Sequence, residues 1–368
     1  MKHLIASSKQ WIWVVVTSLT LSTAYSGTPA IHDEHIGTIH RPIPFAFSIA
    51  AGPNALLNPW KDRVVNFHLS IFAGQVGGVQ GLQLGAIYNQ VQGDFVGYDA
   101  TGIYSHITGN FAGFQAGGLI NRVDGHYVGM QNAGIMNRIG DGYFGMQSAG
   151  ILNQVSGNFI GLQVGGIRNE TEDVKGVQIA GISNEAEDVE GVQISGLINE
   201  AGRVRGVQIG VINRSKKLDG IALGLINLSQ SGKVHLISWG SSESDYQVGV
   251  KFAPNDYWYT ILTMGQLQDP FGSSQLTSFE SHLGFHLPLM AKFFTEIDLG
   301  TGNTAPRTLV DWDSDEYHQM VEARIALGLR ITPRLSLVGG VSSRRTYDGH
   351  DFWDHGKDEV KPFLGIQL

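Results

Sequence analysis

The sequence predicts an all-β protein in which a glycine-rich β-solenoid, built from about ten coils of 14–16 residues, precedes an antiparallel eight-stranded barrel or meander. Three observations lead to this prediction. A phrase of the form Gly-apolar-Gln followed by Gly-apolar-apolar-Asn recurs through residues 78–230, glycine supplies 49 of 368 residues, and apolar/polar alternation replaces the repeat after residue 230. A fixed period indicates units that stack on their neighbours, because one such unit is too small to bury its own apolar side.

The repeated phrase has a constant part and a variable part. GFQAGGLIN ends at Asn121, GVQISGLIN ends at Asn199 and GVQIGVIN ends at Asn213, and successive terminal asparagines are 16, then 15, then 14 residues apart. The contraction from 16 to 15 residues falls between the Asn and the next Gly, which is typical of a wound ribbon with one variable corner. The many glycines argue against helix, since each costs about 1 kcal/mol in a helix interior. The alternative that remains open is a single transmembrane antiparallel barrel that includes the repeats.

Stacked coils would align equivalent side chains, so we predict ladders of glutamine and asparagine that hydrogen-bond from coil to coil. The glycines are expected where the coil needs positive φ or where backbones pass closely. The asparagines are expected at a corner, where the amide bonds backbone groups and tolerates a left-handed conformation. The predicted ladder consists of Gln83, Asn89, Gln115, Asn121, Gln131, Asn137, Gln147, Asn153, Gln163, Asn169, Gln178, Asn184, Gln193, Asn199, Gln208 and Asn213.

Three segments precede the repeats. Residues 1–26 have two lysines, an apolar centre and a small-x-small end at Ala24 and Ser26, which predicts a secretory signal peptide. Residues 27–43 are polar and predict a flexible leader. Residues 44–77 contain two strand-like runs that are expected to cap the first coil or to join the C-terminal sheet.

Residues 231–368 predict the antiparallel barrel-like domain. VEARIALGLRI places Val321 and Leu327 on one face and Glu322 and Arg324 on the other, and the connections alternate between short and long. We predict strands near 233–240, 246–252, 257–265, 278–287, 291–299, 317–331, 334–345 and 360–368.

A soluble antiparallel sheet with one wet face shows the same alternation and remains the alternative for this domain. Aromatic residues at the ends of the strands favour a membrane girdle. They are Trp239, Tyr257, Trp258, Tyr259, Trp312, Tyr317, Tyr347, Phe352 and Trp353. In a barrel of eight strands the interior is filled by side chains, and we expect charges there to pair, Glu322 or Glu296 with Arg324 or Arg330.

The repeats of the GVQIGVIN type, the preceding FHLSIFAGQVGGVQGLQLGAIYN and the closing strand KPFLGIQL resemble a family of bacterial exported surface-repeat proteins with tandem GVQIGLxN repeats. The resemblance covers about two thirds of the chain. It implies a surface or outer-membrane location, with no assigned activity. Two features depart from the family's pattern: some members are lipoproteins whereas this chain has no cysteine, and the last residue is Leu368 where an outer-membrane strand usually ends in Phe or Trp.

The sequence contains no motif of a catalytic nucleophile, a zinc protease or a phosphate loop, so we predict a protein that is not an enzyme and has no cofactor, metal or catalytic residue. The net charge of −8 without a basic patch argues against nucleic acid as a partner. Outer-membrane lipid is the expected partner, with a protein or glycan ligand unidentified. Two acidic groups, Asp173 to Glu190 and His350 to Asp358, are interpreted as solvated rather than metal-binding. A glycan-processing solenoid enzyme is the weaker alternative, because it needs paired carboxylates on one solenoid face.

Overall fold

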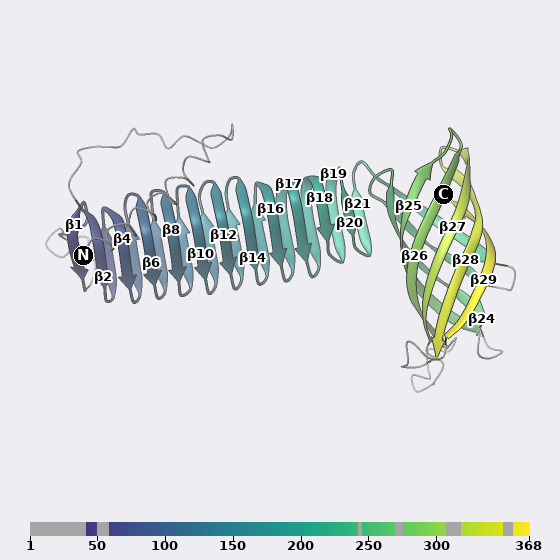
Figure 1. Cartoon of the computed structure of the whole chain (residues 1–368), viewed down its shortest axis with the longest axis horizontal. Helices are drawn as coiled ribbons and strands as arrows, with labels where there is room; N and C mark the ends of the chain where they lie inside the picture. Colours follow the sequence, from purple (N-terminus) through teal and green to yellow (C-terminus); the bar gives the residue numbers. More distant parts are fainter. Residues whose placement is uncertain (1–41, 50–58, 242–244, 269–274, 307–317, 349–355) are drawn as a thin grey trace, which may run out of the picture. The chain divides into compact units, whose positions relative to one another are not determined.

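The computed structural model describes residues 42–49, 59–241, 245–268, 275–306, 318–348 and 356–368. The predicted signal peptide, nearly all of the predicted leader and the group from His350 to His355 lie outside these residues. All regular elements of the described chain are β-strands, and they form a parallel solenoid followed by a closed antiparallel barrel (Figure 1). No helix among the described residues is long and apolar enough to cross a membrane.

The solenoid is made of 21 short strands, as predicted for the repeat region. They are β1 (Ile43–Ser48), β2 (Val64–Ser70), β3 (Ala73–Val76), β4 (Gly78–Gly85), β5 (Tyr88–Val91), β6 (Phe95–Thr101), β7 (Tyr104–Ile107), β8 (Phe111–Gly117), β9 (Ile120–Val123), β10 (Tyr127–Ala133), β11 (Met136–Ile139), β12 (Tyr143–Ala149), β13 (Leu152–Val155), β14 (Phe159–Gly165), β15 (Arg168–Thr171), β16 (Asp173–Ala180), β17 (Ser183–Ser195), β18 (Ile198–Ile209), β19 (Ile212–Leu218), β20 (Ile221–Leu223) and β21 (Ile226–Ser229).

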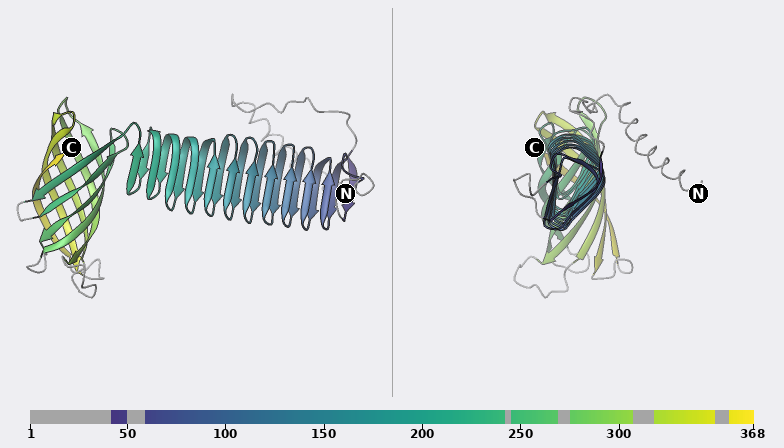
Figure 2. Two further views of the ribbon diagram at one scale, coloured as in Figure 1. Left: turned by 180° about the vertical axis from the view of Figure 1, so that it is seen from behind. Right: turned by 90° about the vertical axis from the view of Figure 1, so that its left-hand side faces the viewer.

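From β4 onward each strand pairs in parallel with the equivalent strand of the next coil without a shift in register, whereas the pairing of β2 with β4 has one irregularity between Val65 and Phe67. Gln131 lies beside Gln115 and Gln147, and Asn137 lies beside Asn121. Viewed end-on, the coils superpose on a single outline (Figure 2). The parallel pairing rules out the alternative in which the repeats are antiparallel strands of one large barrel. After every turn of the coil, the chain runs in the same direction beside the equivalent strand of the previous coil, whereas neighbouring strands of such a barrel would run in opposite directions.

The stack begins before the first clear repeat. β1 pairs with β2 and β2 with β4, all in parallel, so the segment 44–77 supplies the first rungs of the solenoid rather than strands of the barrel. Shortening of the coils merges neighbouring strands at the other end. β17 and β18 run for 13 and 12 residues because the 15-residue coils turn within a continuous strand there.

The barrel is closed by eight antiparallel strands, with the first and last strands paired to each other. They are β22 (Lys233–Ser241), β23 (Tyr246–Ala253), β24 (Trp258–Gln268), β25 (Gln275–Pro288), β26 (Phe293–Pro306), β27 (His318–Thr332), β28 (Leu335–Asp348) and β29 (Gly356–Gln367). The eight predicted strands are confirmed. Several extend further than predicted, because polar segments such as the end of β26 continue the ladder beyond the apolar alternation.

Candidate functional site

Two hydrogen-bonded chains of side-chain amides run through the solenoid. Every predicted ladder residue is buried. Gln131 Nε2 donates to Gln115 Oε1 at 2.8 Å, and each later glutamine donates in the same way to the one before it. Asn121 Nδ2 donates to Asn137 Oδ1 at 3.0 Å, and this chain continues in the opposite direction as far as Asn227. The two amide chains therefore have opposite polarity.

We expected the asparagines at a corner of the coil, and this prediction is wrong. They lie on strands with the side chain pointing inward, and Asn137 Nδ2 also donates to the backbone oxygen of Ser148 in the next coil at 2.6 Å. Tolerance of the left-handed conformation is not the reason for asparagine. A short amide that reaches both its ladder neighbour and a backbone carbonyl satisfies two acceptors with one NH2 group.

A buried carboxylate ends the glutamine chain. Asp99 occupies the position of a glutamine in the imperfect repeat, fully buried, and accepts from four donors. Gln83 Nε2 and Thr101 Oγ1 donate to Oδ1 at 2.9 and 3.0 Å, while Ser105 Oγ and Gln115 Nε2 donate to Oδ2 at 2.5 and 3.0 Å. Gln83 and Gln115 both turn their NH2 groups toward Asp99. Asp99 therefore fixes the direction of the hydrogen bonds in the glutamine chain that starts at Gln115.

The rung on β2 differs again. His68 stands where a glutamine would be, with Nδ1 at 2.9 Å from Gln83 Oε1 and Nε2 at 3.1 Å from Ser48 Oγ. Burial lowers the pKa of His68, although its hydrogen bond with Gln83 and the charge of Asp99 act to raise it.

One column of glycines is required by the backbone. Gly145 and its equivalents have φ near +136°, and a Cβ on Gly145 would lie 1.9 Å from the carbonyl oxygen of Gly129 in the previous coil. Coils stacked at about 4.8 Å leave no space for a side chain at this point. The prediction of positive φ and close approach is confirmed for this column.

A stack of aromatic rings fills the wider coils and was not anticipated. Phe95, Phe111, Tyr127, Tyr143 and Phe159 lie face to face with centroid separations of 4.6–5.2 Å. The GNF and GHY segments of the 16-residue coils carried the signal, since they place an aromatic residue at the same position of each coil. Valine replaces the ring in later coils.

The outer wall of the barrel is apolar. On β27 the predicted alternation is confirmed: Ile325 and Leu327 are 54% and 64% exposed, while Glu322 and Arg324 are buried in the lumen. The outward charges Arg345 and Asp358 lie toward one end of their strands, 3.7 Å apart.

The predicted aromatic girdle is partly wrong. Tyr257 and Trp258 belong to the outer surface, where Trp258 packs against Phe285 with ring centroids 3.7 Å apart. Trp239 and Tyr259 point into the lumen instead, because their strands present alternate residues to the interior. Trp312, Tyr317, Phe352 and Trp353 lie outside the described residues.

The lumen is filled by a network of charged side chains. Arg324 forms a bidentate pair with Asp298 at 2.8 and 3.1 Å and covers the ring of Trp239 at 4.0 Å. Asp298 also accepts from the Tyr259 hydroxyl at 2.8 Å and lies 3.1 Å from Nδ1 of His282. The space left beside these groups measures about 20 Å³, room for about one water molecule.

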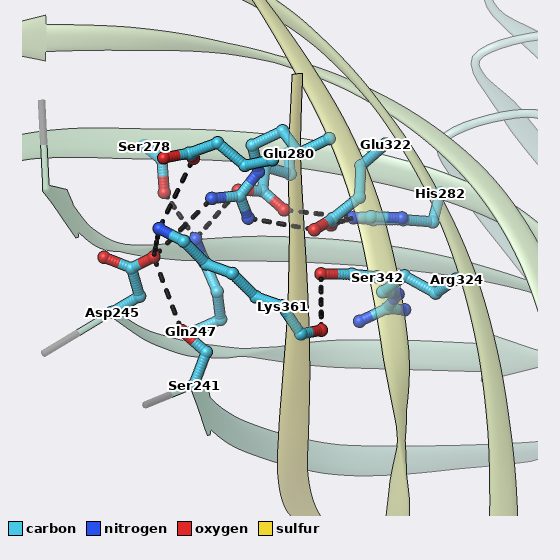
Figure 3. Close-up of polar contacts among 12 residues, drawn as sticks. Ser241, Asp245, Gln247, Ser278, Glu280, His282, Glu322, Arg324, Ser342 and Lys361 are labelled. Carbon is cyan, nitrogen blue, oxygen red and sulfur yellow. Dashed lines mark hydrogen bonds and ion pairs between the residues drawn. The ribbon is translucent and has the colours of Figure 1, made fainter. Parts of the chain in front are cut away.

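A second group continues the network along the lumen (Figure 3). Arg344 lies 3.0 Å from Glu322 and 3.5 Å from Glu280, and Lys361 lies 3.1 Å from Asp245. Burial of these charges is tolerated because each is paired and hydrogen-bonded.

The charge pairing was predicted, but the partners were not. Glu296 binds Lys251, His286 and Gln367 rather than an arginine. Arg330 is exposed near the end of β27 and takes no part. Alternation along one strand fixes which side chains face inward, whereas the pairs depend on the register across several strands.

Glu280, His282 and Glu322 form the one group of metal-ligating side chains found in the described chain, with ligand atoms within 4.8 Å of one another. The guanidinium of Arg344 already occupies the position beside both carboxylates. The chemistry of this group is therefore that of an internal ion-pair cluster, which closes the lumen.

No family model matches the chain, and no curated protein matches it. Among solved structures, the N-terminal β-barrel domain of Pseudomonas aeruginosa OprF aligns with 37% of this chain and 97% of that domain, at 16% identity and a TM-score of 0.27. Neisserial surface protein A aligns with 37% of this chain and 92% of its own, at 12% identity and a TM-score of 0.24. A designed transmembrane β-barrel aligns with the same share of this chain at 14% identity, over 91% of its own length and with a TM-score of 0.23. Similarity at this level carries no argument about function.

Proposed function

We propose that this chain is a non-enzymatic, exported outer-membrane protein, in which the barrel is seated in the lipid and the solenoid is an interaction or display element. The observation that carries the proposal is the inverted barrel: apolar side chains such as Ile325 and Leu327 face outward, and charged side chains face inward. A soluble barrel would bury the apolar set and expose the charged one. In a bilayer the same arrangement places every apolar face against hydrocarbon.

The filled lumen argues for a structural role rather than transport. Arg324 and Arg344 pair with carboxylates on neighbouring strands, Arg344 also reaches Glu280 on β25, and the described interior retains little free space. An eight-stranded barrel has room only for its own side chains. The solenoid, with some ten stacked coils on a parallel ladder, offers a long rigid surface instead.

Cell fractionation combined with gel mobility tests the membrane seat. We expect the full chain in the outer-membrane fraction, with a faster band in unheated samples than in boiled ones, because a folded barrel resists detergent. Ile325→Arg, at the middle of β27 on the outer wall, is expected to destabilise insertion by about 2–4 kcal/mol. Glu187→Arg, on the solvated side of the solenoid, serves as the matched control. A soluble full chain, or equal behaviour of the two variants, would refute the proposal.

A further inference from the structure

The outer surface of the solenoid has a continuous apolar edge. The corner residue between the glutamine strand and the asparagine strand is Ile, Leu or Val in ten successive coils, and each is 37–49% exposed. We call this row the apolar edge. It consists of Ile87, Ile103, Leu119, Ile135, Ile151, Ile167, Ile182, Leu197, Val211 and Leu225.

Charge is segregated away from this edge. The charged side chains of the later coils, such as Glu187 and Arg203, lie in the variable part of the coil that follows the asparagine. Within the ten repeated phrases the charged residues are Asp99, which is buried, and Arg168, which turns to bind Glu170 and Glu185. The two edges of the ribbon therefore differ in polarity along its whole length.

The interior is inverted to match. Beneath the charged edge lie Phe111, Tyr127, Val189 and other apolar residues of the core. Beneath the apolar edge lie the glutamine and asparagine chains, whose amides hydrogen-bond to one another. A β-ribbon with polar groups inside and apolar groups outside follows the same rule as the barrel. In the middle coils the corner amides are bonded to the preceding coil, as Ile151 N is to the carbonyl oxygen of Ile135. The bonded corner amides at residues 135, 151, 167, 182 and 197 need no water.

We propose that the apolar edge is a lipid-contacting surface, so that the solenoid lies along the membrane with this edge among acyl chains and the charged edge in water. This inference rests on the proposed membrane seat of the barrel. The apolar edge leads to the outer wall of the barrel: Leu223 and Leu225 of the last coil line a cavity of about 380 Å³ together with Leu262, Leu283 and Leu299. Lipid that covers the outer wall of the barrel is the simplest cover for the apolar edge of the solenoid as well.

A lipid surface fits the edge better than a protein partner does. Ten coils at about 4.8 Å each make a straight row about 48 Å long. Apart from the cavity at Leu225, the row is formed by side chains of similar size. A protein partner would need an equally long complementary strip, and specific interfaces usually combine an apolar centre with a polar rim. A fluid hydrocarbon phase needs neither.

The absence of cysteine makes the test direct, because single cysteines can be labelled in an otherwise unreactive chain. Three variants of the full chain, reconstituted in phosphatidylcholine vesicles, carry a nitroxide at one position each: Ile135→Cys on the apolar edge, Glu187→Cys on the charged edge, and Leu327→Cys on the barrel wall. We expect the labels at 135 and 327 to collide more with oxygen than with a water-soluble nickel complex. The label at 187 should show the reverse.

The outcomes separate the two proposals. Lipid exposure at 327 with water exposure at 135 would overturn the apolar edge while leaving the membrane seat intact. Water exposure at both positions would overturn both. Spin–spin broadening at 135 that disappears on dilution with unlabelled protein would assign the edge to a second copy of the chain, and would also overturn the lipid proposal.

A second variant guards against an effect of the label. Replacing Ile135, Ile151 and Ile167 together by Asp changes exposed side chains only, so the solenoid should keep its β-circular dichroism. In these vesicles a nitroxide attached to the variant Ile182→Cys should then collide more often with the nickel complex and less often with oxygen. An unchanged label in the folded triple variant would contradict the proposal.

Discussion

Replacing Asp99 by Leu tests whether one carboxylate organises the amide chain. Leucine keeps the branched shape of the side chain but accepts no hydrogen bond, so the NH2 group of Gln83 loses its acceptor, and that of Gln115 loses one of its two and keeps the Ser105 hydroxyl. The orphaned buried donor of Gln83 costs about 1–3 kcal/mol. The hydroxyls of Thr101 and Ser105 can rotate toward other acceptors and are left out of this figure.

Hydrogen exchange of the full chain, followed by mass spectrometry, measures the loss of local stability around Asp99. Every 1.4 kcal/mol changes an equilibrium tenfold, so amides of residues 78–120 should exchange roughly 5-fold to 150-fold faster in the variant. Glu187→Leu removes an exposed carboxylate and is the control. The double variant Asp99→Gln with Ser105→Asn restores the regular repeat and should exchange more slowly than Asp99→Leu. Equal exchange in Asp99→Leu and the control would refute this account.

Three further outcomes are expected. Gly145→Ala should lower the thermal midpoint through backbone strain of about 1–3 kcal/mol, whereas Gly142→Ala, whose Cβ would meet its nearest atom at 3.2 Å, should change it little; equal shifts would contradict the stacking argument. Because burial lowers the pKa of His68, stability contributed by its neutral form is complete above the unfolded pKa of about 6.5 and is lost as pH falls toward the folded value; His68→Gln should therefore flatten the decline in unfolding free energy between pH 7 and 5. Arg324→Met leaves Asp298 buried without its bidentate partner and should cost the barrel about 3–5 kcal/mol in urea unfolding, and a barrel that unfolds at the wild-type urea concentration would show that the pair contributes nothing.

Much of the architecture could be predicted because the repeat fixes both period and register. Once Gln115 and Gln131 fall at the same point of successive coils, parallel stacking brings them together without further information. The strands of the barrel were recognisable for the same reason, since the alternation around Ile325 shows which residues share a face.

The rest depends on contacts between residues far apart in sequence. The polarity of the amide chain follows from Asp99, and the imperfect repeat GYDATGIYS gave only its position. The partner of Glu322 proved to be Arg344, from the adjacent strand, because cross-strand register and closure of the barrel decide which inward charges meet. The repeat does place Ile or Leu between the Gln and Asn positions, but periodicity alone does not show which of these side chains face the interior of the solenoid and which face outward.

The opposed amide chains have a consequence for how such a rod can change in length. Glutamine amides donate toward the N-terminus and asparagine amides toward the C-terminus, so an added coil contributes two dipoles that largely cancel. Extending the rod therefore adds little net dipole from these side-chain amides, unlike the peptide dipoles of a lengthening helix. Tandem duplication or loss of a whole coil is electrostatically neutral at this level, which leaves the number of repeats free to vary while Asp99 sets the polarity at one end.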